Sequence, residues 1–123
     1  MFSRYAAALM LAAEIVIHAY LVPDHLEEMP YIGVGFIVAS VLCAVALVLV
    51  LLDRSVGWVL GTLLCVGMAG LFVISRVVGL PDYHEEWTSD SSLGLWALLP
   101  EAVFVLLAYV RLRQRSELIA VLA

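Results

Sequence analysis

Four ionisable side chains interrupt otherwise apolar stretches of this chain, and their types could hold a proton or a metal ion. Glu14 and His18 are four residues apart, so a helix would place them on one face, one turn from each other. Arg76 and Glu101 lie in two later apolar stretches. Carboxylates and imidazole bind protons and divalent metals, and a guanidinium offers a planar fork of donors to a carboxylate. These four residues form the first candidate site, a buried polar cluster.

A second group of polar residues lies in two short segments that resemble each other, residues 23–28 and residues 81–86. Each begins Pro-Asp, contains a histidine and ends in a Glu-Glu pair, directly after an apolar run. Histidine beside carboxylates can ligate zinc, manganese or iron. The candidate ligands of a divalent metal are His25, Glu28, His84 and Glu85. Their spacing matches no established metal motif, so solvated acidic loops without a metal remain the alternative.

The composition predicts the elements that must position these residues. Of 123 residues, 65% are hydrophobic and the mean hydropathy is +1.10, which is more apolar surface than a soluble chain of this length can bury. A membrane-spanning helix needs about 20 apolar residues. Four stretches qualify: residues 5–22, 31–52, 57–80 and 93–110. We therefore predict an all-α bundle of four transmembrane helices as a single domain, followed by a short tail at 111–123 that either continues the fourth helix or lies on the inner leaflet.

The arginines predict the orientation, because the chain contains no lysine and only six positive residues. Five of them flank one side of the predicted spans: Arg4, Arg54, Arg111, Arg113 and Arg115. The positive-inside rule assigns that side, and both termini, to the cytoplasm. The two opposite loops carry seven acidic residues and no lysine or arginine. Such a surface repels nucleic acid, which excludes it as a partner, and concentrates cations near the outer face.

The positions of the four intramembrane residues predict that they meet. At 1.5 Å per residue, Glu14 and Glu101 each lie about 12 Å below the outer end of their span, and His18 and Arg76 each lie about 6 Å below theirs. We expect Arg76 to pair with Glu14 or Glu101. Three interpretations stay open: a polar clasp that only fixes helix packing, a path for a proton or cation, and a cavity that recognises a ligand headgroup through Arg76.

Other chemistries fit the sequence less well. A haem is disfavoured, because only His18 lies within a span and the second axial ligand would have to be an interfacial histidine, a methionine or a residue of another chain. Cys43 and Cys65 lie inside spans and form no C-x-x-C motif, so we expect them to be buried and unreactive. In span three, Gly57-x-x-x-Gly61 predicts close packing of two helices.

Two motifs carry a resemblance to a known group of proteins. The motifs His25-x-x-Glu28-x-Pro30-Tyr31-x-Gly33 and Ser75-Arg76-x-x-Gly79-Leu80-Pro81 resemble a functionally uncharacterised family of small bacterial four-helix integral membrane proteins. The resemblance covers most of the chain. It implies the four-helix fold and the bacterial cytoplasmic membrane, and it implies no catalytic or binding residue.

These observations favour binding over catalysis, since no serine, cysteine or lysine lies beside a base, although a metal hydrolase remains open. We expect a small multi-pass membrane protein that binds a cation or proton at a polar site facing outward. The alternative is a non-catalytic accessory or assembly subunit of a larger membrane complex. The lipid bilayer is the expected surrounding, and the sequence leaves a homo-oligomer open.

Overall fold

The structure is a computed structural model that describes residues 2–80 and 92–122, and these two ranges form four long α-helices. The helices are α1 (Phe2–Glu28), α2 (Pro30–Leu51), α3 (Ser55–Val77) and α4 (Ser92–Leu122). Each is long and apolar enough to cross a membrane. The predicted all-α bundle of four transmembrane helices is therefore confirmed, and the chain is a multi-pass membrane protein.

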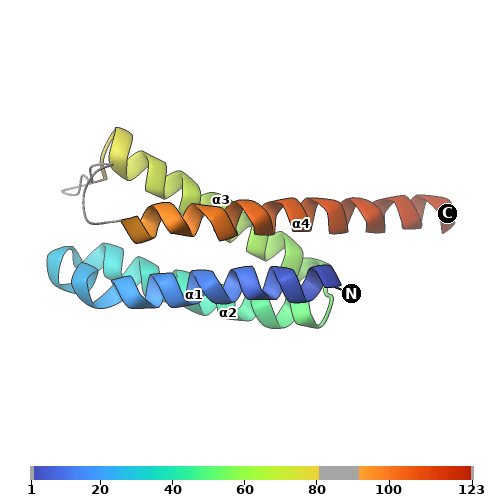
Figure 1. Cartoon of the computed structure of the whole chain (residues 1–123), viewed down its shortest axis with the longest axis horizontal. Coiled ribbons are helices and arrows are strands. Elements are labelled where there is room, and N and C mark those ends of the chain that lie inside the picture. Colours follow the sequence, from blue (N-terminus) through green and yellow to red (C-terminus); the bar gives the residue numbers. More distant parts are fainter. Residues whose placement is uncertain (1, 81–91, 123) are drawn as a thin grey trace.

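The helices pack in a ring in which consecutive helices contact each other and α1 also contacts α4. α1 packs on α2 and α4, and α3 packs on the same two helices. The N- and C-termini lie at one end of the bundle together with the turn between α2 and α3, whereas the turn between α1 and α2 lies at the other end (Figure 1). We call the end with the α1–α2 turn the distal end. The loop segment 81–86, with His84 and Glu85, lies outside the described residues.

α1 is longer than the predicted span of residues 5–22, because it continues through Pro23 to Glu28. A proline inside a helix removes one backbone hydrogen bond but does not have to end the helix. Only Met29 separates α1 from α2, and α2 begins with Pro30, a residue whose fixed φ and missing N–H suit the first helical position. His25 and Glu28 thus lie on the last turns of a helix and not in a loop.

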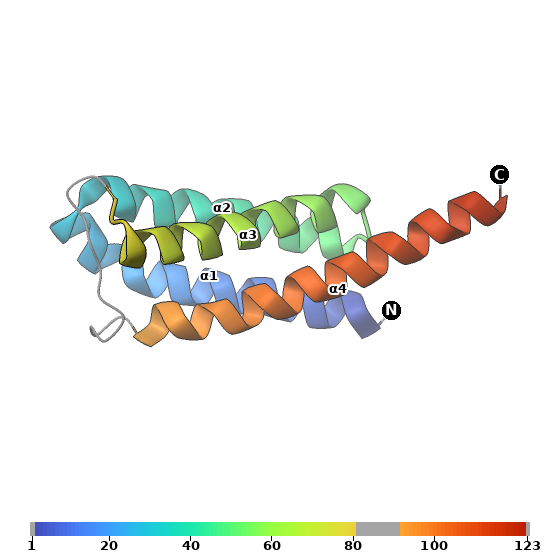
Figure 2. The same cartoon turned by 90° about the horizontal axis from the view of Figure 1, so that it is seen from above.

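α4 also exceeds its predicted span of 93–110. Its 31 residues correspond to about 46 Å of helix, longer than the roughly 30 Å hydrocarbon core of a bilayer. Of the two alternatives for the tail, the structure has the first: it continues the helix to Leu122 and projects past the rest of the bundle (Figure 2). Pro100 lies within this helix. The extension belongs to the end of the bundle that carries both termini.

A buried stripe on α1 and a buried stripe on α4 form the core that positions the candidate site. On α1 the stripe is Ala7, Leu11, Glu14 and His18, and on α4 it is Ala97, Glu101, Phe104 and Ala108. Both stripes step by four, three and four residues, which keeps them on one face of a helix. The two glutamates therefore occupy positions at which most neighbours are apolar core residues.

Small residues allow α3 to approach this core closely. Trp58 and Phe104 are both fully buried and their rings stack at 6.0 Å between centroids. A Cβ atom at Gly61 would collide with the Phe104 ring, so the glycine is what allows α3 to lie against α4 at this level. Close packing was predicted from Gly57-x-x-x-Gly61, and both glycines have it: Gly57 lies against Leu49 and Val50 of α2, and Gly61 lies against Phe104 of α4. The two cysteines, Cys43 and Cys65, are free and buried in the same core.

Candidate functional site

Three of the four intramembrane ionisable residues come together in the bundle. Glu14 and His18 extend from α1 and Glu101 extends from α4, and one ligand atom from each residue lies within 4.8 Å of those of the other two. We call these three residues the acid–histidine cluster. The stripes on α1 and α4 explain the meeting, because Glu14 and Glu101 occupy corresponding places in two helices that pack against each other.

Three of the four carboxyl oxygens in the cluster are buried without a hydrogen-bond donor among the described residues. Glu14 is 0% exposed and Glu101 is 4% exposed. Within the described ranges, both carboxyl oxygens of Glu14 and Oε2 of Glu101 have no hydrogen-bond partner. Buried polar groups are almost always satisfied, and two carboxylates so close together repel each other unless a proton or a cation neutralises them. A bound proton or cation would relieve this repulsion.

The orientation of the His18 ring follows from one hydrogen bond. Its Nδ1 lies 2.8 Å from the backbone carbonyl oxygen of Glu14 and 3.4 Å from Oε2 of the same residue. A carbonyl oxygen can only accept a hydrogen bond, so Nδ1 carries the hydrogen and donates it. In the neutral ring, the lone pair then resides on Nε2. The Phe36 ring packs edge-on against His18, with centroids 5.2 Å apart.

Arg76 is buried near the cluster but its described contacts are with other groups. Its Nη1 donates to Ser75 Oγ at 2.9 Å and to the Phe72 carbonyl oxygen at 3.5 Å, and its guanidinium lies 3.6 Å from the centroid of the Phe72 ring. The expected ion pair with Glu14 or Glu101 is not among the salt bridges between described residues. Arg76 belongs to the wall of the site and Ser75 and Phe72 hold it there.

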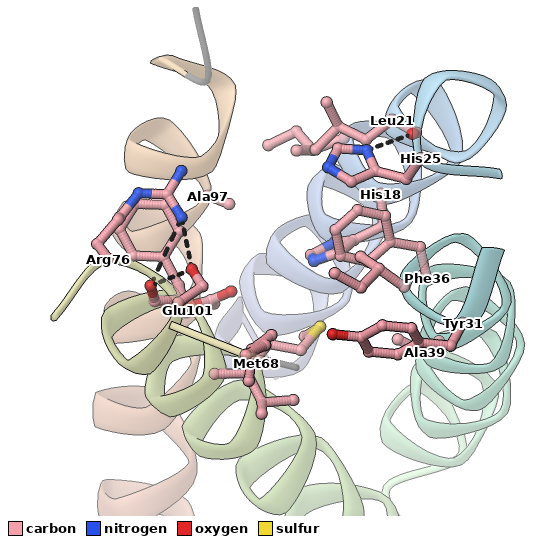
Figure 3. Close-up of a pocket in the computed structure, with 17 residues that line it drawn as sticks. His18, Leu21, His25, Tyr31, Phe36, Ala39, Met68, Arg76, Ala97 and Glu101 are labelled. Carbon is pink, nitrogen blue, oxygen red and sulfur yellow. Dashed lines mark hydrogen bonds between the residues drawn. The ribbon is translucent and has the colours of Figure 1, made fainter. Parts of the chain in front are cut away.

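A cavity of about 280 Å³ connects the cluster to the distal half of the bundle. Arg76 and Glu101 lie on the side formed by α3 and α4, and His18, His25, Phe36 and Tyr31 lie on the side formed by α1 and α2 (Figure 3). Most of the remaining wall is apolar, including Leu21, Met68 and Ala97. Ligand sites typically combine an apolar wall with a few polar groups in this way. Glu101 and His18 line the cavity directly.

Glu101 also borders a second hollow, between α3 and α4. A shallow groove between α3 and α4 is lined by Cys65, Ala69 and Ala102 as well as by Glu101. Its rim includes Leu106 and Tyr109, which are 63% and 60% exposed and face the surroundings of the helices. In a membrane this surface contacts lipid. Glu101 therefore lies between an internal cavity and a groove that opens towards the hydrocarbon.

The second set of predicted ligands is only partly described. His25 lines the distal part of the cavity, donates from Nδ1 to the Leu21 carbonyl oxygen at 2.8 Å and packs edge-on against Phe36 at 4.8 Å. Glu28 is exposed at the end of α1. His84 and Glu85 fall outside the described residues. Among described residues, the metal-ligand group that the structure presents is the acid–histidine cluster and does not include His25 or Glu28.

Sequence reasoning missed the residues that shape the cavity around these ligands. Phe36 contacts the rings of both His18 and His25, and Phe72 and Ser75 hold Arg76. A signal for Phe36 was present, since it lies four residues after Ile32 and seven before Cys43 on the buried face of α2. The sequence alone does not indicate that an aromatic residue in an apolar span packs against histidine rings.

Comparison with known proteins adds no functional assignment. No family model, no curated protein and no solved structure matches this chain.

Proposed function

We propose that this protein belongs to the bacterial inner membrane and binds a cation, a metal ion or a proton, at a polar site that opens to the outer face. The observation that carries the proposal is the pair of buried carboxyl groups, Glu14 and Glu101, with three oxygens that lack hydrogen-bond donors among the described residues. A buried polar cluster that serves helix packing alone stabilises the protein only when its groups are hydrogen-bonded or ion-paired with one another. Buried carboxyl oxygens without donors cost stability, so packing alone does not explain them.

Orientation follows from the charges at the two ends of the bundle. The turn between α2 and α3 lies at the end that carries both termini (Figure 1). Arg54 belongs to this turn, Arg111 and Arg115 on α4 bond Asp53 of the same turn, and Arg113 lies between them in sequence. The positive-inside rule makes this end cytoplasmic. The cavity occupies the distal half and would then open towards the outside, where Asp24, Glu27 and Glu28 concentrate cations. The motif resemblance described above supports the bacterial assignment.

Dicyclohexylcarbodiimide tests this proposal, because it is apolar and reacts with protonated carboxyl groups in apolar surroundings. The full chain is purified in mild detergent, stripped of metals with EDTA, treated with the reagent and digested for mass spectrometry. We expect an adduct on Glu101 or Glu14, lost in Glu101→Gln or Glu14→Gln respectively. The exposed Glu117 serves as the internal control and should stay unmodified.

An adduct on either glutamate means that the pair holds a proton when no metal is present. Slower labelling in the presence of a metal ion means that the ion occupies the same site. A protein that gives no adduct and binds no cation would contradict the proposal.

A further inference from the structure

We infer that Glu14, His18 and Glu101 form a site for one divalent transition metal ion, such as Mn²⁺, Fe²⁺ or Zn²⁺, with an open coordination position facing the cavity. This inference rests on the proposed function and names the cation. Two carboxylates and one imidazole are a ligand set that these ions accept, and the cluster itself contains no thiolate that would favour Cu⁺.

The three ligand atoms would have to move only slightly closer together to bind one ion. Three atoms that bind one ion at about 2.1 Å are about 3.4 Å apart in tetrahedral geometry. In the structure one nitrogen of the His18 ring and one carboxyl oxygen of each glutamate lie within 4.8 Å of one another. Rotation of the two glutamate side chains closes a difference of this size, and their unpartnered oxygens have no protein hydrogen bond to break.

The His18 ring is oriented as a metal ligand requires. Metal-binding histidines usually donate the N–H of their second ring nitrogen to a carboxylate or backbone carbonyl, which fixes the tautomer. Here Nδ1 donates to the Glu14 carbonyl oxygen at 2.8 Å and leaves the lone pair on Nε2. One turn of α1 therefore supplies a carboxylate, an imidazole and the carbonyl that orients the imidazole.

The charge of the cluster selects a divalent ion. Two carboxylates and a neutral imidazole carry a charge of −2, so a divalent ion makes the buried site neutral and a monovalent ion leaves it negative. Burial makes this difference large, because charges interact more strongly away from water. Arg76 lies on the cavity wall, and its described contacts direct it to Ser75 and Phe72.

The site is open and not closed around its ion. Structural zinc sites have four protein ligands, whereas catalytic and transport sites keep a position for water or another ligand. The cluster supplies three residues, and both His18 and Glu101 border the cavity of about 280 Å³. An ion bound here can therefore exchange through the distal half of the bundle.

Metal titration of the full chain in detergent tests the inference. After EDTA treatment, calorimetry with Zn²⁺ and electron paramagnetic resonance with Mn²⁺ measure stoichiometry and affinity. We expect one ion per chain, and at least 10-fold weaker binding in Glu14→Gln, Glu101→Gln and His18→Gln. Glu117→Gln, the same substitution at an exposed glutamate, should bind like the wild type. Circular dichroism and gel filtration establish that each variant is folded, and Glu14→Asp provides a charge-retaining variant.

The outcomes separate this inference from the proposed function. Binding that is lost in His25→Ala but kept in Glu14→Gln would place the ion at the distal end and overturn the inference. Carbodiimide labelling of Glu14 or Glu101 with no metal binding would also overturn it, while the proton form of the proposed function would stand. If the protein shows neither carbodiimide labelling nor metal binding, both this inference and the proposed function are overturned.

Discussion

Asp53 and Arg111 lie 58 residues apart in sequence and form a double hydrogen bond that joins the α2–α3 turn to α4. Arg111 donates from Nε to Asp53 Oδ1 at 3.3 Å and from Nη2 to Oδ2, and Arg115 adds a second ion pair to Oδ2 at 2.9 Å. Asp53 has a positive φ of 56°, a conformation that asparagine, aspartate and glycine tolerate best. One aspartate thus ends α2 and ties the turn to the last helix.

This arrangement predicts a pH-dependent contribution of Asp53 to stability. Desolvation raises the pKa of Asp53, but hydrogen bonds from Arg111 and the charges of Arg111 and Arg115 outweigh it and hold the pKa below its ordinary value. A lowered pKa means that the stabilisation is present above the ordinary pKa and is lost as the pH falls through the folded-state pKa. We expect Asp53→Asn to lower the free energy of unfolding by about 1 kcal/mol at pH 7.

Denaturant unfolding in detergent at pH 7 and at pH 3 measures this effect, and the difference between wild type and Asp53→Asn should shrink at the lower pH. Asparagine keeps the tolerance for positive φ, so the loss reports the charge. Asp53→Ala should cost more, because alanine also disfavours that conformation. Equal stability of all three proteins at pH 7 would contradict the assigned role.

The buried carboxyl groups of Glu14 and Glu101 predict that removing a charge at the centre of the bundle raises the free energy of unfolding, whereas removing the charge of Asp53 lowers it. Without a metal, Glu14→Gln removes the repulsion between two buried acids, so we expect the free energy of unfolding in EDTA to rise by on the order of 1 kcal/mol. Proteins are often less stable with a functional residue in place than with a substitution that removes its function. Thermal unfolding in detergent with EDTA is the measurement. A decrease of similar size would show that Glu14 is a packing clasp with satisfied partners.

The sequence predicted the number of helices well because membrane spans need long apolar runs, and this chain has four. It predicted helix ends poorly. Pro23 suggested the end of α1, but the helix continues five residues beyond it. The polar residues after Val110 left two possibilities open, and the structure has the one in which α4 continues to Leu122. A single proline or a polar segment outside the hydrocarbon does not break a helix whose backbone remains hydrogen-bonded.

Depth counting placed Glu14 and Glu101 at one level, and the structure has them together, because helical rise per residue varies little. The same counting could not place Arg76. Its partner depends on the rotation of α3 about its axis and on the direction of a long side chain, and neither follows from depth. Local contacts with Ser75 and Phe72 hold the guanidinium instead. His25 was expected in a loop, and the helical extension of α1 brings it to the cavity.

Phe36 should influence the cluster through its contact with His18. Edge-on aromatic contacts contribute about 0.5–1.5 kcal/mol, so we expect Phe36→Ala to weaken metal binding by roughly 2-fold to 10-fold. Ile37→Ala is the matched control, because Ile37 is the next residue on α2, is 41% exposed and does not line the cavity. Calorimetric titration of both variants decides the point, and equal affinities would show that Phe36 does not hold the His18 ring.

Gly61 should be much more sensitive to substitution than Gly67, which lies on the same helix. A Cβ at this position meets the Phe104 ring, whereas a Cβ at Gly67 meets nothing within 4 Å. We expect Gly61→Ala to lower the free energy of unfolding by about 1–3 kcal/mol through overpacking. Gly67→Ala should leave it unchanged or raise it by up to about 1 kcal/mol, since alanine is the better helix former. Similar effects of the two substitutions would mean that α3 and α4 do not approach closely at Gly61.

The proposed orientation predicts which residues a membrane-impermeant maleimide reaches in intact cells. Cys43 and Cys65 are buried, and their replacement by alanine gives a background free of thiols. In that background, Glu28→Cys at the distal end should be labelled in whole cells, whereas Glu117→Cys on the α4 extension should be labelled only after the membrane is permeabilised. Both glutamates are exposed, so access depends on the side of the membrane. The reverse pattern would place the cavity towards the cytoplasm and make any bound cation exchange with the cell interior.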